Sequence, residues 1–280
     1  MAKKRKIEVV YKEQITHLFL AILDVAANDV KNDGNFEVNY KKRLKFQKTT
    51  DWKKYRTCVD LIDDTEYAIL SAFQYQLGDI SKNKDFGEKY LRLYGTLNAV
   101  YLQMNAISAL ANLLNYPKRA EIMLNFQNLD IYKLRGIAGA HTTDYMYDQA
   151  TLNSNPSIYR NTSFRIVQMH LEKTGSNIIV LDENNIQFEY NLLSILSEYE
   201  NIERELIVSL INHMIDTMFF KQKQKIELRE RLNALLPNII VYGNVNKNKD
   251  YQSKRAKRRD ELLTRIKKDI PKYKNNYDIA

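Results

Sequence analysis

Glycine and proline are scarce in this chain, and that scarcity limits its fold more than any other feature. Its 280 residues include 8 glycines and 4 prolines, and the stretch 191–236 contains neither. Sheet sandwiches need a turn roughly every ten residues and draw on these two residue types to make it. A hydrophobic content of 44% excludes general disorder and low-complexity classes. The sequence therefore predicts a mainly α protein.

Apolar residues recur at helical spacing in several long segments. We expect helices over 8–31, 51–77, 86–114, 118–126 and 129–140, with Gly78 capping the second and Pro117 opening the fourth. Between 163 and 190 the pattern alternates with period two and is interrupted by two turns, which indicates a three-stranded antiparallel β meander. Segment 191–236 returns to helical spacing, as one long helix or two joined end to end.

These patterns divide the chain into four parts. We expect a helical bundle over 1–155, a β meander over 156–190, a long helix with a connector over 191–246 and a basic tail over 247–280. The single cysteine, Cys58, fits a reducing compartment and is interpreted as small apolar filler in a helix. The most apolar stretch, 15–27, is too short to span a bilayer. The expected location is cytoplasmic, with no membrane partner.

Positive charge is concentrated near the end of the chain. Residues 247–274 hold twelve basic and four acidic side chains, which gives +8 of a total net charge of +9. A basic tail on a nearly neutral body is typical of contact with a polyanion such as RNA. The alternative is a solvated helix face in a lysine-rich composition. The residues that we expect to bind the RNA backbone are Lys254, Arg255, Lys257, Arg258 and Arg259.

Common catalytic signatures are missing from the sequence. It has no phosphate-binding glycine loop, no nucleophile elbow and no CxxC or HExxH pair, and its histidines (17, 141, 170 and 213) are scattered without metal-ligand spacing. His17 and His213 lie on apolar stripes and are interpreted as core or interface residues. The acidic run Asp60–Asp64 is interpreted as a solvated helix face. No metal or other cofactor is expected.

Arg135 and His141 remain as candidate catalytic residues, at the end of a predicted helix. Metal-free RNA cleavage needs a group that takes the 2′-hydroxyl proton, a group that protonates the leaving 5′-oxygen, and a cation for the developing charge. Histidine can serve as base or acid near neutral pH, and arginine matches the phosphate oxygens with a fixed charge. One histidine cannot fill both proton-transfer roles, so a two-fold dimer would supply the second pair.

Arg135-x5-His141, preceded by the long helical segment Leu93–Ile107, resembles the Rx4–6H motif of the HEPN superfamily of prokaryotic ribonucleases and defence proteins. The resemblance covers about residues 50–150. It implies a homodimer whose Arg135 and His141 line a shared groove, metal-independent endoribonuclease activity, and a toxin or anti-phage role with an antitoxin or regulatory protein as a possible partner. Gly136 and Thr142 depart from the usual motif, which has a polar residue after the arginine and proline after the histidine.

Two other interpretations stay open. The chain could be a non-catalytic HEPN-like helical dimer that binds nucleic acid or a partner protein. Alternatively, the motif could be coincidental in an unrelated helical protein. In both of these interpretations Arg135 would form a salt bridge to Asp130 or Asp144 and His141 would cap a helix end. In the ribonuclease dimer and in the non-catalytic dimer alike, we expect contact between the helix faces that bear Gly136 and Gly139. Small residues at these positions let two helices approach closely.

Overall fold

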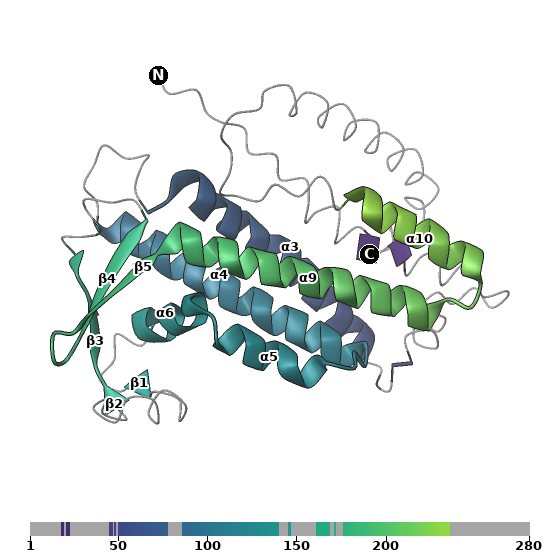
Figure 1. Ribbon diagram of the computed structural model, residues 1–280, viewed down its shortest axis with the longest axis horizontal. Helices are drawn as coiled ribbons and strands as arrows, with labels where there is room; N and C mark the ends of the chain where they lie inside the picture. Colours follow the sequence, from purple (N-terminus) through teal and green to yellow (C-terminus); the bar gives the residue numbers. More distant parts are fainter. Residues whose placement is uncertain are drawn as a thin grey trace, which may run out of the picture.

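The fold is given by a computed structural model. It describes residues 50–77, 86–139, 145–146, 161–168 and 176–235, together with residues 18, 19, 21, 22, 45, 46, 48 and 171. Within these residues the chain is mainly helical with a small antiparallel sheet, as the sequence predicts (Figure 1). The helices are α3 (Asp51–Tyr75), α4 (Phe86–Leu113), α5 (Arg119–Gln127), α6 (Asp130–Gly139), α9 (Leu192–Met218) and α10 (Gln222–Leu235).

The predicted helix boundaries agree closely with the observed ones for α3 to α6. One difference concerns the end of α3, where the sequence predicts Gly78 as the cap. The helix ends at Tyr75, and Gln76 takes a positive φ of 52° while its backbone N–H still donates to Ala72 O at 2.8 Å. The chain therefore leaves the helix before it reaches the glycine. Of the helix expected over 8–31 the structure describes only Leu18, Phe19, Ala21 and Ile22, which are helical.

Helix α4 is the centre of the bundle. It packs against α3 over the most extensive helix contact of the fold, and also against α5, α6 and α9 (Figure 1). Its buried face is largely apolar, with Leu93, Leu97, Met104 and Ile107 each no more than 2% exposed. Burial of such side chains contributes roughly 1.5–3 kcal/mol each, which is why this long helix holds its neighbours together.

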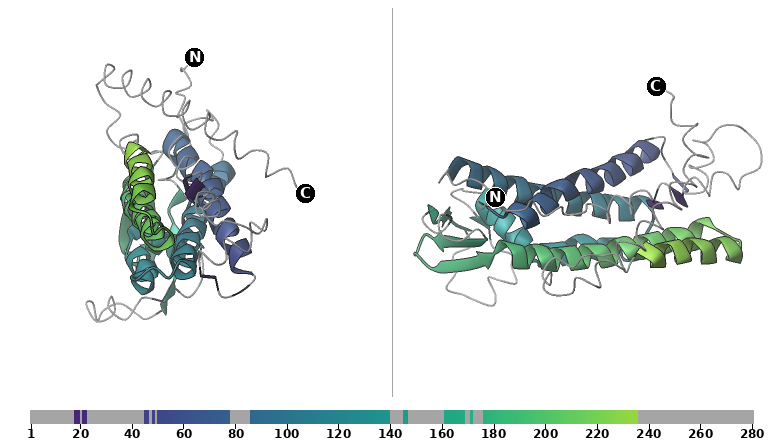
Figure 2. Two further views of the ribbon diagram at one scale, coloured as in Figure 1. Left: turned by 90° about the vertical axis from the view of Figure 1, so that its right-hand side faces the viewer. Right: turned by 90° about the horizontal axis from the view of Figure 1, so that it is seen from above.

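The glycine-free segment forms two helices. Helix α9 begins directly after the sheet, where the Asn191 side chain accepts a 3.0 Å hydrogen bond from Ser194 N as a helix N-cap. It ends at Met218, and Phe219–Lys221 join it to α10. The segment is therefore two helices, but they are not joined end to end as the sequence suggests, because α10 turns back against α9 and its Arg229 pairs with Asp216 of α9. Figure 2 shows α9 and α10 along one side of the bundle and α3 along the other.

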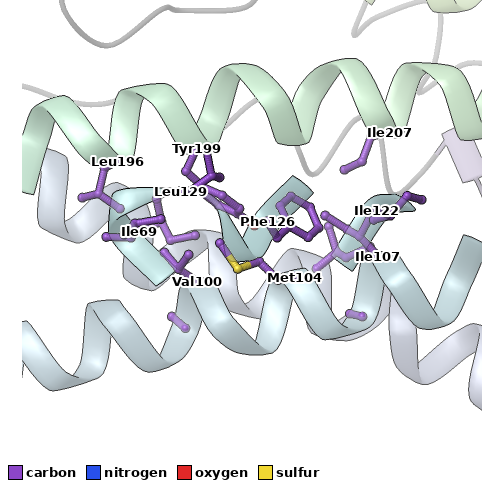
Figure 3. Packing of buried hydrophobic residues seen from close by; sticks show 14 of the residues in the cluster. Ile69, Val100, Met104, Ile107, Ile122, Phe126, Leu129, Leu196, Tyr199 and Ile207 are labelled. Carbon is purple, nitrogen blue, oxygen red and sulfur yellow. The ribbon is translucent and has the colours of Figure 1, made fainter. Parts of the chain in front are cut away.

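Side chains from α3, α4, α5, α6, α9 and α10 share one continuous core with the sheet. Tyr199 of α9 lies against the ring of Phe126 of α5, with ring centroids 5.9 Å apart, and Met104 of α4 lies beneath them (Figure 3). Ile69 of α3 belongs to the same cluster. The long helix at 192–218 therefore packs as a member of the bundle.

The predicted meander is present as the antiparallel sheet β3 (Phe164–Ile166), β4 (Asn177–Asp182) and β5 (Gln187–Asn191), in that order. Asp182 ends β4, and its Oδ1 accepts hydrogen bonds from Asn184 N at 2.9 Å and Ile186 N at 2.7 Å, which closes the expected turn. Asn185 takes a positive φ of 60° in this turn. A second pairing, β1 (Tyr145–Met146) with β2 (Asn161–Thr162), is not predicted by the sequence pattern.

The first strand of the sheet is shorter than the predicted alternation over 163–172. It ends at Ile166, and residue 168 is already helical. Leu171 is nevertheless buried, and its carbonyl accepts a 2.6 Å hydrogen bond from Lys89 Nζ of α4. Leu171 thus faces the core without belonging to a strand. None of the helices that the structure describes has the length and apolar character needed to cross a bilayer.

Candidate nucleic-acid site on helix α6

Arg135 lies in the middle of α6. Helix α6 packs beside the strand β3 of the three-stranded sheet (Figure 1). Helical spacing turns one face of α6 into the core, where Ile131, Leu134 and Ile137 are at most 6% exposed. Arg135 falls on the flank of this face and is half-buried. Arg135 is therefore held by a packed helix while part of the residue stays exposed.

The Arg135 side chain contacts one tyrosine ring, and a second tyrosine packs against that ring. The guanidinium carbon lies 3.9 Å from the centroid of the Tyr101 ring of α4, within the range of a cation–π contact. The ring of Tyr132, one turn before Arg135 in α6, lies 6.1 Å from the ring of Tyr101 at an interplanar angle of 49°. The result is a cluster of one cation and two aromatic rings, Arg135, Tyr101 and Tyr132, which we call the α4–α6 cluster.

The cluster has the chemistry of a single-strand nucleic-acid contact. Arginine presents several N–H donors that match phosphate oxygens, and tyrosine rings offer faces on which bases stack. The motif spacing singles out Arg135 but misses Tyr101 and Tyr132. A signal for Tyr132 existed, because it precedes Arg135 by three residues, which places both on one flank of a helix.

Arg135 makes no ion pair with any residue that the structure describes. The alternative in which Arg135 is bridged to Asp130 is wrong, because the Asp130 carboxylate pairs with Lys133 Nζ at 3.3 Å. Lys133 lies three residues after Asp130 and reaches it along the helix, whereas Arg135 is turned toward Tyr101. The charge of Arg135 is therefore not neutralised by a carboxylate of α6. Asp144 lies outside the described residues.

The other predicted site residues lie outside the part of the chain that the structure describes. These are His141 and the five basic tail residues Lys254, Arg255, Lys257, Arg258 and Arg259. The described part of α6 ends at Gly139, so the relation between Arg135 and His141 stays a prediction, as does the pairing of helices through Gly136 and Gly139.

His213 occupies the kind of position that its apolar stripe predicts. It is half-buried on α9, with Nε2 3.0 Å from the carbonyl oxygen of Leu114 and its ring edge-on to Tyr116 at 5.5 Å. It joins α9 to the turn between α4 and α5, so its role is structural. His17 and His170 lie outside the described residues.

Cys58 is the buried apolar filler that the sequence predicts. It is 8% exposed on α3, and burial raises the pKa of its thiol from 9.0 to about 11, an effect that the nearby Lys54 ammonium partly offsets. A thiol with so high a pKa is protonated at neutral pH and a poor nucleophile. Within the described ranges, no cluster of three or more His, Cys, Asp or Glu side chains could hold a metal ion.

Comparison of the chain with models of protein families, with curated proteins and with solved structures found no match. The functional assignment therefore rests on the residues themselves and on the geometry of the α4–α6 cluster.

Proposed function

We propose that this protein is a metal-independent endoribonuclease of the HEPN type. The observation that carries the proposal is the state of Arg135, a half-buried residue whose guanidinium is stacked on Tyr101 and has no carboxylate partner in the described structure. A cation held in this way can bind a phosphate without first breaking an internal ion pair. Tyr101 and Tyr132 supply ring surface beside it for a nucleobase.

The proposed reaction is an in-line transfer within the RNA. His141 of one protomer removes the proton from a ribose 2′-hydroxyl, and the resulting oxygen attacks the adjacent phosphorus. The bond from phosphorus to the 5′-oxygen breaks, and His141 of the second protomer protonates that oxygen. Arg135 stabilises the negative charge that grows on the phosphoryl oxygens. The products are a 2′,3′-cyclic phosphate and a 5′-hydroxyl, and no metal takes part.

The decisive experiment combines two site variants with one control. His141→Ala and Arg135→Ala in the full chain should each lower the rate of RNA cleavage by about 100-fold or more. Loss of a general acid, a general base or a charge-stabilising group typically lowers a rate by about 10²–10⁴-fold. Arg119→Ala removes an exposed arginine of α5 and should leave the rate unchanged. Cleavage should continue in EDTA. Persistent cleavage by His141→Ala, or its loss in EDTA, would contradict the mechanism.

The basic tail has a separate role in this proposal. Its side chains hold the RNA backbone without reading sequence, so they release counterions when RNA binds. Deletion of 247–274 should weaken binding and flatten the dependence of log Kd on log salt by about 0.7 for each phosphate that the tail neutralises on a single strand. The His141→Ala variant allows this measurement without degradation of the RNA. If the slope of log Kd against log salt does not change, the tail does not contact the RNA.

A non-catalytic binding module is the second candidate, and the α4–α6 cluster favours it too, because stacking and phosphate contact need no proton transfer. In that case Arg135→Ala should weaken RNA binding while His141→Ala changes nothing, and the wild-type protein should leave RNA intact. A toxin or anti-phage role, and control by an antitoxin or regulatory protein, belong to the first proposal only. They are tested by the growth of cells that express wild-type protein or His141→Ala.

A further inference from the structure

A pocket of about 720 Å³ is lined by residues from the region where α3 begins and α4 ends. Figure 1 shows that this end of the bundle lies opposite the sheet. Its volume is in the range of sites that hold small organic ligands and exceeds what a free inorganic anion needs. On the α3 side its wall carries Lys53, Lys54 and Cys58, and on the α4 side Asn112 and Leu113, with Phe46 from the segment before α3.

The charge of the pocket is positive. Lys53 and Lys54 are exposed on the first turns of α3, and neither has an ion-pair partner among the described residues. The carboxylate in the wall, Asp51, is only 9% exposed, and its Oδ2 accepts a 2.9 Å hydrogen bond from Lys48 N. Two ammonium groups are thus available to an anionic ligand, while the neighbouring carboxylate is turned to the backbone.

The remainder of the wall suits a flat, partly polar group. Phe46 and Leu113 are half-buried and give the pocket an apolar surface. Beside them, Asn112 donates from Nδ2 to Ser108 O at 2.9 Å, which orients its amide and leaves Oδ1 as an acceptor. An aromatic ring that carries N–H donors at its edge, such as a nucleobase, matches this combination of surfaces.

We propose that this pocket binds a free nucleoside phosphate, with the phosphate at Lys53 and Lys54 and the base between Phe46, Leu113 and Asn112. The site is separate from the α4–α6 cluster. Asn112 follows Tyr101 by eleven residues, about 16 Å along α4. The proposal therefore does not depend on the ribonuclease assignment.

The test measures binding of AMP, ATP, adenosine and inorganic phosphate to the full chain by isothermal titration calorimetry. We expect AMP or ATP to bind one per chain, and adenosine and phosphate at least tenfold more weakly, because each lacks half of the contacts. Lys53→Ala with Lys54→Ala should weaken nucleotide binding at least tenfold, because hydrogen bonds between charged groups are stronger than those between neutral groups. Lys221→Ala with Lys223→Ala removes two exposed lysines before and in α10 and should leave it unchanged.

Three results would overturn this proposal. The first is equal binding of phosphate and AMP, which would make the pocket an unspecific anion site. The second is nucleotide binding that survives loss of both lysines. The third is an oligoribonucleotide that needs Lys53 and Lys54 while no mononucleotide binds, which would make the pocket part of an RNA path. Arg135→Ala should leave AMP binding intact, so failure of the ribonuclease proposal and failure of this one are distinguishable. Thermal unfolding confirms that each variant is folded.

Discussion

The hydroxyl of Tyr199 on α9 donates a 2.7 Å hydrogen bond to Oε1 of Gln103 on α4. The Gln103 amide nitrogen donates in turn to Thr65 Oγ1 at 3.1 Å and to the carbonyl oxygen of Ile62 at 3.0 Å, both on α3. Gln103 is fully buried, so one side chain connects three helices of the bundle inside an apolar core. Buried polar groups of this kind fix how helices align, because they are satisfied in one arrangement.

Gln103→Leu should destabilise the protein by about 2 kcal/mol or more, since it leaves buried partners without hydrogen bonds. Tyr199→Phe removes one donor and should cost about 1 kcal/mol. The double variant should cost less than the sum, with a coupling energy of about 1 kcal/mol. The free energy of unfolding in urea measures all three. Additive effects would mean that the two side chains do not act together.

Helix positions were predictable here because apolar spacing is a local property of the sequence. The boundaries of α4 follow from its stripe and from Pro117, and the start of α9 from the change of period after the meander. The turn after β4 was predictable for the same reason, because Asp182 and its neighbours bond to their own backbone.

Contacts between distant residues could not be read from such patterns. The bond between Gln103 and Tyr199 joins positions 96 apart, and the strands β1 and β2 pair over only two residues each. The cluster of Arg135 with Tyr101 likewise depends on how α6 packs on α4. The sequence could therefore propose Arg135 as a site residue but could not name the ring on which it rests.

Cys58 gives the protein a testable response to alkaline pH. Its pKa is raised to about 11 in the folded state, from 9.0, so the folded protein binds this proton more tightly than the unfolded chain. The resulting stabilisation is complete below about pH 9 and is lost as the pH rises through 11. Tyr55, also buried, has a raised pKa and adds to the same trend.

Cys58→Ala should make the free energy of unfolding less dependent on pH between 9 and 11, whatever its effect at neutral pH. Urea unfolding at closely spaced pH values gives the two curves. In the native wild-type protein at mildly alkaline pH the thiol should react with iodoacetamide far more slowly than free cysteine does. Equal labelling rates would show that the thiol is neither buried nor shifted.

Gly95→Ala should stabilise the protein. Gly95 lies inside α4 and is exposed, and a Cβ placed on it would meet no atom within 4 Å. Glycine costs about 0.5–1 kcal/mol relative to alanine in the interior of a helix, because it loses more backbone freedom on folding. The melting temperature should rise accordingly. A fall would indicate that a second molecule or another part of the chain occupies this surface.

Tyr101 allows the role of the α4–α6 cluster to be separated from that of Arg135 itself. Tyr101→Phe keeps a ring beneath the guanidinium, whereas Tyr101→Leu keeps the apolar bulk and removes the ring. A cation–π contact at a partly exposed site contributes about 0.5–1 kcal/mol, so the leucine variant should bind RNA about two- to fivefold more weakly and cleave it more slowly. The phenylalanine variant should match the wild type. RNA affinity, measured in the His141→Ala background, and cleavage rate, measured without it, test both expectations. Equal RNA affinities for the leucine and phenylalanine variants would contradict this expectation. They would show that the Tyr101 ring only fills space against α6 and does not help Arg135 to bind RNA.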